Sequence, residues 1–265
     1  MKTSLLALCL MACCCVAFGQ ELYVNTEPAS NMAARSLGIR MENQGFFDPE
    51  FKNRTTLEAM YGASGKLMLH GAAYLSDFYQ PRQRFEGGSF YAKYRFLSVD
   101  DVQRHFRGAV FGKLAGSRNS YAVQELALEG DNSGVQSGLV FTQLLHKLAL
   151  SASGSYIRGL NSDNASGRIT GAKEALGYTL SAGYLLFPKN YRSYDQVNVN
   201  LYAELLGKTN PGYGQSYLDA APAIQFIFNS VCRLDFSYRA PLYNNMLRNS
   251  ANMYLLRFEY NFFEL

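Results

Sequence analysis

The stretch YLLRFEYNFFEL, residues 254–265, closes the chain and decides how the rest is interpreted. Read at every second position, it separates into an apolar face and a face that carries Arg257 and Glu259. The apolar face consists of Tyr254, Leu256, Phe258, Tyr260 and Phe262. This two-residue period is typical of a β-strand. We interpret the apolar face as one that meets lipid, and the charged face as one that lines the inside of a closed barrel.

Eleven more alternating segments precede this one, with turn signals between them. Most are about ten residues long, the length that a tilted strand needs to cross the hydrocarbon layer. The predicted strands are centred on residues 36–42, 55–64, 67–76, 89–97, 106–115, 135–145, 147–157, 174–187, 196–206, 216–228, 232–242 and 253–263. The sequence therefore predicts an all-β fold: a closed antiparallel up-and-down transmembrane β-barrel of about twelve strands within residues 36–265.

The connections alternate in length, as expected for a bacterial barrel with long outer loops and short inner turns. The predicted outer loops are 43–54, 77–88, 116–134, 158–173, 207–215 and 243–252. The alternation holds only if VQELALEG, residues 123–130, belongs to an outer loop, as a short hairpin or helix. Counting it as a strand would give an odd number of strands.

A soluble β-sandwich would show the same alternation, with its apolar face inward. Three features favour a membrane barrel: an apolar face without charges, Tyr and Phe near the strand ends, and an export signal. No apolar run of eighteen residues follows the leader, which argues against a helical membrane span. Pro222 lies on the lipid face of a predicted strand, so a bulge or kink is expected there.

The first nineteen residues have the layout of a secretory signal peptide, with Lys2, an apolar core and a small-x-small site that predicts cleavage after Gly19. An alternative is a lipobox that leaves Cys13 as a lipidated N-terminus. Cleavage after Gly19 leaves only Cys232, so no intramolecular disulfide is possible. Export and barrel together predict the bacterial outer membrane. Residues 20–35 would form a periplasmic segment or a plug.

Charged residues on the inward face are the candidate functional constellation. The predicted lumen-lining residues are Arg40, Glu42, Glu58, Lys93, Arg95, Arg107, Lys113, Glu204, Asp219, Arg233, Asp235, Arg239, Arg257 and Glu259. One interpretation is a salt-bridge network that fills a narrow lumen. The other is a polar pore with a slight preference for anions.

The sequence predicts no catalytic, cofactor-binding or metal site. A lipid hydrolase would need a His at the outer rim, but His70, His105 and His146 are predicted near the inner end. The loop acids lack calcium-site spacing; the run from Gly130 to Gly134 is better explained by turn chemistry than by calcium. A formal charge of +4 and the alternation within YAKYR do not predict nucleic-acid binding.

Partners follow from the predicted location and from two kinds of segment. Outer-membrane lipid and the barrel-assembly machinery are expected partners. A protein partner could bind residues 20–35 or the aromatic outer loops 43–54 and 77–88. These loops carry Phe46, Phe47, Phe51, Phe78, Tyr79 and Phe85, which either form a binding surface or pack together over the barrel mouth.

Four stretches carry a resemblance to known barrels: ELYVNTEPASNMAARSLGIRM, YAKYRFLSVDDVQRHFRGAVFGKLA, EGDNSGVQSGLVFTQLLHKLALSASGSYI and LSAGYLLFPKNYRSYDQVNVNLYAELLGK. The whole mature chain resembles an uncharacterised family of outer-membrane β-barrels from Bacteroidota. Its ending, FSYRAPL to YLLRFEYNF, is more loosely similar to transporter barrels of aromatic-degradation gene clusters. The resemblance implies no site residue. The chain departs from the usual assembly signal, because Glu264 and Leu265 follow Phe263.

Together these observations predict passive transport, or a channel, for a small polar or aromatic solute. The alternatives are a non-conducting structural or accessory subunit of an outer-membrane complex and, less favoured, a lipid hydrolase.

Overall fold

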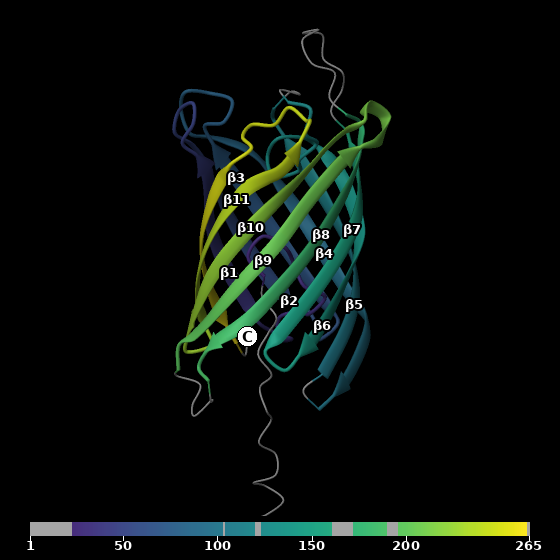
Figure 1. The fold of residues 1–265 in the computed structure, drawn as a ribbon, viewed down its shortest axis with the longest axis vertical. Coiled ribbons are helices and arrows are strands. Elements are labelled where there is room, and N and C mark those ends of the chain that lie inside the picture. The colour runs from purple at the N-terminus through teal and green to yellow at the C-terminus, as the bar shows by residue number, and fades with distance from the viewer. Residues whose placement is uncertain (1–22, 103, 120–122, 161–171, 190–195, 264–265) are drawn as a thin grey trace, which may run out of the picture.

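Twelve antiparallel strands form a closed barrel in the computed structural model (Figure 1). The structure describes residues 23–102, 104–119, 123–160, 172–189 and 196–263. The strands are β1 (Leu37–Phe46), β2 (Lys52–Gly62), β3 (Leu67–Ser76), β4 (Arg84–Asp101), β5 (Arg104–Ser117), β6 (Gly134–Leu145), β7 (Leu148–Gly159), β8 (Glu174–Phe187), β9 (Asn198–Asn210), β10 (Gln215–Phe228), β11 (Cys232–Asn244) and β12 (Met253–Phe262). A 3₁₀ turn, η1 (Pro211–Tyr213), connects β9 and β10. The predicted fold class is confirmed.

Each strand pairs with its neighbours in the sequence, and β12 pairs with β1 to close the barrel. The longest connections, between β5 and β6 and between β7 and β8, lie at one end, and most connections at the other end, where β1 begins and β12 ends, are short (Figure 1). We refer to the end with the long loops as the outer end. Closure gives each of the described strands a neighbour on both sides, which matters because unpaired backbone groups are costly in lipid.

The two faces of β12 point where the terminal stretch predicts. Phe258 and Phe262 are 43% and 45% exposed on the outside of the barrel, whereas Arg257 and Glu259 are 7% and 3% exposed inside it. Exposed apolar side chains also mark the outer faces of β4, β8 and β9. The soluble sandwich is excluded, because a single closed sheet turns its apolar face outward.

The strands differ from the prediction mainly at their ends. At the outer end, β2 begins at Lys52, β4 at Arg84, and β9 continues to Asn210. At the inner end, the β4–β5 ladder continues from the pair of Ser98 and Arg107 to the pair of Asp101 and Arg104, beyond the predicted strand ends. Residues 123–130 lie between β5 and β6, as predicted, but in neither a hairpin nor a helix. In the part of the chain that the structure describes, no helix has the length and apolarity to cross a membrane.

Pro222 points outward, as predicted, but the bulge lies elsewhere. The ladder between β10 and β11 passes from the pair Ala220 and Ala240 to the pair Ala223 and Ser237, without a change of register around the proline. The register shift lies earlier, between Leu218 and Asp219. The sheet thus accommodates the missing donor by a local gap in the ladder rather than by a bulge.

Candidate functional site in the barrel lumen

Opposite charges on neighbouring strands form a network around one side of the lumen wall. The register places Arg40 of β1 opposite both Glu58 of β2 and Glu259 of β12. Arg40 bonds to these carboxylates at 2.9 and 2.8 Å. Arg233 of β11 also meets Glu259, at 2.9 Å. Because every member is paired, this part of the wall carries little uncompensated charge.

The network continues along β11 and β12. Arg257 pairs with Glu42 across the closure and lies 3.5 Å from Asp235. Arg239 pairs with Asp219 at 3.1 Å, and Arg248 of the last outer loop pairs with the same carboxylate. Arg95 is partly buried beside a register shift in β4. The remaining predicted lumen residues, Lys93, Arg107, Lys113 and Glu204, contact segments that enter the lumen from its ends.

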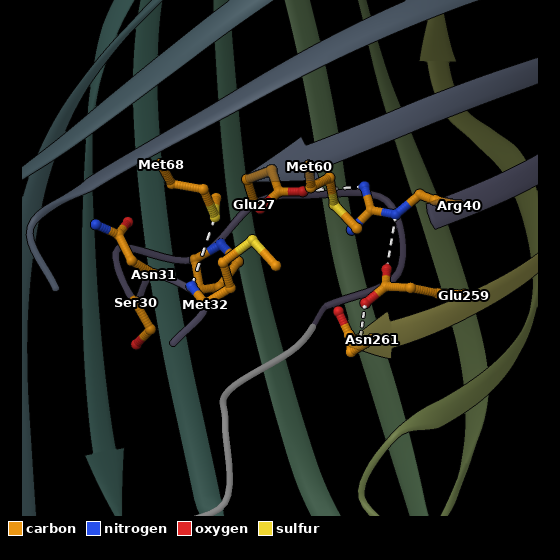
Figure 2. A pocket seen from close by; sticks show the side chains of 10 residues that line it. Glu27, Ser30, Asn31, Met32, Arg40, Met60, Met68, Glu259 and Asn261 are labelled. Carbon is orange, nitrogen blue, oxygen red and sulfur yellow. Dashed lines mark hydrogen bonds and ion pairs between the residues drawn. The ribbon is translucent and has the colours of Figure 1, made fainter. Parts of the chain in front are cut away.

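The first of these segments is the inner plug, which we define as residues 23–35. Figure 2 shows this chain crossing the inside of the barrel. The backbone amides of Val24 and Asn25 donate to Glu204 of β9 at 3.1 and 2.8 Å, and the Thr26 hydroxyl donates to the same carboxylate at 2.8 Å. Tyr23 packs edge-on against Tyr202, with ring centroids 5.6 Å apart. One wall carboxylate therefore holds the start of the plug.

Further along, the inner plug is held by the opposite wall. The Lys93 ammonium of β4 donates to the carbonyls of Pro28 and Ser30 at 2.7 and 2.8 Å. The amide of Ala29 donates to Thr142 of β6 at 2.9 Å. Glu27 adds an ion pair with Arg40 at 3.2 Å. The sequence leaves two locations open for this segment, the periplasm and the lumen. The contacts described here lie inside the lumen.

A cavity of about 30 Å³ remains between the inner plug and the wall. Its lining includes Met32 of the plug, Met60 and Met68 of the wall, and the Arg40 and Glu259 pair (Figure 2). This volume has room for one or two water molecules but not for a solute.

The second segment is the outer plug, which we define as residues 123–133 of the loop between β5 and β6. Leu126 and Leu128 are buried against Ile157 of β7 and Ala175 of β8. Because hydrophobic side chains anchor it from within the barrel, this part of the loop does not extend into water.

Carboxylates of the outer plug meet cations of the wall. Lys208 of β9 donates to Glu125 at 2.9 Å, and the Tyr217 hydroxyl donates to the same oxygen at 2.8 Å. Lys113 of β5 donates to Glu129 at 2.6 Å. Burial opposes both charges, but nearby Lys208 and Lys113 lower the pKa values of Glu125 and Glu129 to about 2. Both plug carboxylates are therefore ionised at neutral pH.

Asp131 provides a third contact between the outer plug and the wall. Arg54 of β2 donates to its two oxygens at 2.9 and 2.6 Å, and the Tyr79 hydroxyl also donates to it. The side-chain oxygen of Asn132 accepts a hydrogen bond from the backbone amide of Ala127 at 3.2 Å, as is common for asparagine in turns. No cluster of three or more acidic, His or Cys side chains suited to a metal occurs among the described residues. The structure thus gives Asp131 a guanidinium partner.

The three histidines lie far from an outer-rim site. His70 is buried in β3 and shares a hydrogen bond of 2.8 Å with Glu58, while His146 is in the exposed turn between β6 and β7. His105 belongs to β5 rather than to a turn, because the hairpin is longer than predicted; it contacts Asp100 at 2.7 Å. Each is thus placed in the wall or near the inner end.

Some aromatic residues of the outer loops pack together, as one alternative predicts, and others are exposed. Phe46 and Phe78 are buried together with Met253, with ring centroids of the two phenylalanines 5.2 Å apart. Phe47 and Phe51 remain exposed and surround Tyr254 on the outside, at centroid distances of 5.3 and 6.4 Å. Tyr79 reaches Asp131, whereas Phe85 is 49% exposed. The exposed group resembles an aromatic girdle at the outer membrane interface.

Sequence reasoning missed several charged residues of the lumen. Arg54 and Lys208 follow the same two-residue period as Glu58 and Glu204, so continuing the alternation would have found them. Glu86 is fully buried beside Arg54 but lies at a register shift between β3 and β4, which breaks the period. Nothing in the sequence indicates which loop acids turn inward.

The solved structures that resemble this fold include two porin structures. One, described as "KdgM porin", has a TM-score of 0.52 at 12% identity and covers 86% of this chain and 99% of its own. The other, "KdgM porin in complex with disordered oligogalacturonate", has a TM-score of 0.51 at 11% identity with the same coverage. No protein-family model and no curated sequence matches the chain. At these identities the likeness concerns the fold.

The fold and its apolar outer band point to the bacterial outer membrane, where closed antiparallel barrels of this kind reside. The location thus rests on barrel architecture.

Proposed function

We propose that the protein is a passive outer-membrane channel for a small polar solute, and that the structure represents its closed state. The observation that carries this proposal is how the lumen is filled. The inner plug and the outer plug are separate segments, and each is held by side chains of a complete wall. Because neither plug is a strand, its departure would break no ladder of the barrel.

A wall of twelve strands can enclose a polar path once both plugs leave. Lys93, Arg107 and Glu204, which bind the inner plug in this structure, would then face the open lumen. Charged rings of this kind set ion preference in pores. The similarity to a porin fold agrees with a channel role, but it does not identify the solute.

Planar-bilayer recordings of three variants test the proposal. The first lacks residues 23–35, the second has residues 123–131 replaced by a short Gly-Ser linker, and the third combines both changes. We expect infrequent openings in the unmodified protein and stable, discrete conductance in the combined variant. Each single variant is the matched control, since one plug remains in place. A combined variant that forms a heat-modifiable barrel yet stays silent would contradict the channel.

The alternative is a non-conducting accessory subunit of an outer-membrane complex. It is favoured by one observation: the cavity beside the inner plug is only about 30 Å³. A silent combined variant, together with a stoichiometric partner recovered from native membranes, would support it. The signal peptide of residues 1–19 and the alternative lipidated Cys13 lie outside the described residues, and both stay predictions. The Bacteroidota family also stays a prediction.

A further inference from the structure

The two halves of the lumen wall balance their charges differently. On the side of Arg40, Arg233 and Arg257, the wall supplies its own carboxylates. Near the outer end, the plug supplies the carboxylates for Lys113, Lys208 and Arg54. Glu86 is the additional wall carboxylate near Arg54, at 3.4 Å. Without the outer plug, this part of the wall would carry a net positive charge.

Each of the three contacts has the form of a carboxylate-binding site. An ammonium or guanidinium group faces the acid in every case, and a tyrosine hydroxyl joins it at Glu125 and at Asp131. Each cation also lies over an aromatic ring. Lys113 is 5.9 Å from the ring centre of Tyr74 and Lys208 is 5.9 Å from that of Tyr217. Arg54 lies 4.5 Å from the ring centre of Phe78. Charge-assisted hydrogen bonds of this kind are strong and directional. All three cations are at most 14% exposed, so the sites are shielded from bulk water.

We propose that this part of the wall is a receptor for a solute that carries several carboxylates, and that the outer plug occupies it as an internal competitor. The inference rests on the proposed channel function and names its solute class. Glu125, Glu129 and Asp131 take the positions of the solute's carboxylates in the closed state. An acidic solute arriving from outside displaces them and opens the outer half of the path.

Competition explains why the unmodified protein should bind such a solute weakly. A tethered competitor has an effective concentration on the order of millimolar. Neutralising the plug acids should therefore raise the affinity for an external polycarboxylate. Neutralising the wall cations as well should abolish the gain.

Citrate is the probe for a calorimetric test in detergent. We expect Glu125→Gln with Glu129→Gln to bind citrate at least about ten times more tightly than the unmodified protein. Adding Lys113→Gln and Lys208→Gln should remove that gain. Glu50→Gln, which neutralises an exposed loop acid, is the matched control and should change nothing. Xylitol, which is uncharged, should bind to none of the proteins. Equal citrate affinity in all four proteins would overturn the proposal.

Hydrogen exchange on the unmodified protein provides a second test that needs no variant to fold. Citrate at about tens of millimolar should speed exchange across residues 123–133 and leave residues 23–35 unchanged. Unchanged exchange in both segments would overturn the competitor role. A silent channel with citrate binding intact would instead contradict the proposed function, so the two failures are distinguishable.

Discussion

The inner plug and the outer plug fill the same lumen by different chemistry. The inner plug is held through its backbone as well as its side chains. Glu204, Thr142 and Lys93 of the wall bind its amides and carbonyls, while Thr26 and Glu27 bind the wall through their side chains. The outer plug is held through its side chains, by acids that meet wall cations and by two buried leucines. Backbone anchoring tolerates many plug sequences, whereas side-chain anchoring depends on particular residues. The difference predicts that the two plugs respond to different perturbations.

The largest effect is expected at Glu204, because one carboxylate accepts bonds from Val24, Asn25 and Thr26. Glu204→Ala removes them all, and a hydrogen bond to a charged group contributes about 1.5–3 kcal/mol. Hydrogen exchange of residues 23–35 should accelerate by about a hundredfold or more, with residues 123–133 unaffected. Glu204→Gln, which keeps an acceptor, should show a smaller effect. Equal acceleration in both plugs would show that they are coupled, and the comparison would fail.

Leu126→Ala is expected to act next most strongly, and only on the outer plug. Leu126 is fully buried beside Leu128, Ile157 and Ala175, and a buried Leu→Ala change costs about 2–5 kcal/mol. Hydrogen exchange of residues 123–133 should rise by at least about thirtyfold. The control is Leu160→Ala, at an exposed leucine, which should leave exchange unchanged. A similar rise in residues 23–35 would mean that the inner plug depends on the outer one.

Acidification should loosen the outer plug in a defined range. The folded pKa values of Glu125 and Glu129 are about 2, below the ordinary 4.5, so their stabilisation is complete above 4.5 and is lost as pH falls toward 2. Pepsin cleavage within residues 123–133 should accelerate over that range. Glu125 should contribute more, since its side chain is 13% exposed and that of Glu129 is 42%.

The control for acidification is the variant Glu125→Gln with Glu129→Gln, which has no carboxylate to protonate at either position. It should be cleaved faster than the unmodified protein at pH 5, and the ratio of the two rates should approach one near pH 2. A ratio that stays constant would show that these carboxylates do not hold the plug.

Salt should produce the smallest effect. The pair between Lys113 and Glu129 is the more exposed of the two lysine pairs, and screening acts most on exposed charges. Raising the salt concentration from about 0.05 to about 1 M should speed exchange of residues 123–133 several-fold. Residues 23–35 should change less, since several of their contacts involve uncharged backbone amides and carbonyls of the plug. A larger response in the inner plug would reverse the comparison.

The same contrast explains how far sequence reasoning reached. The barrel follows from a two-residue period that acts locally, so Phe258 outside and Glu259 inside could be predicted from β12 alone. The inner plug could be placed only as one of two alternatives, because anchors at the amides of Val24 and Ala29 depend on no particular side chain. For the outer plug, the acids are visible in the sequence, but Lys208, the partner of Glu125, and Arg54, the partner of Asp131, fall in predicted loops. The paired residues are 83 and 77 positions apart in the sequence, so no local pattern predicts these contacts.

The long β4–β5 hairpin has a consequence for self-association. β3 begins at Leu67, opposite Tyr94, so among the described residues β4 has a neighbouring strand on only one side beyond Arg95. An unpaired strand edge of this kind is a site at which another copy of the chain could add a strand. Asp100, Asp101 and Arg104 crowd the tip with charge, and charged side chains discourage such pairing. The charged tip of this hairpin thus opposes edge-to-edge pairing with another copy, independent of either plug.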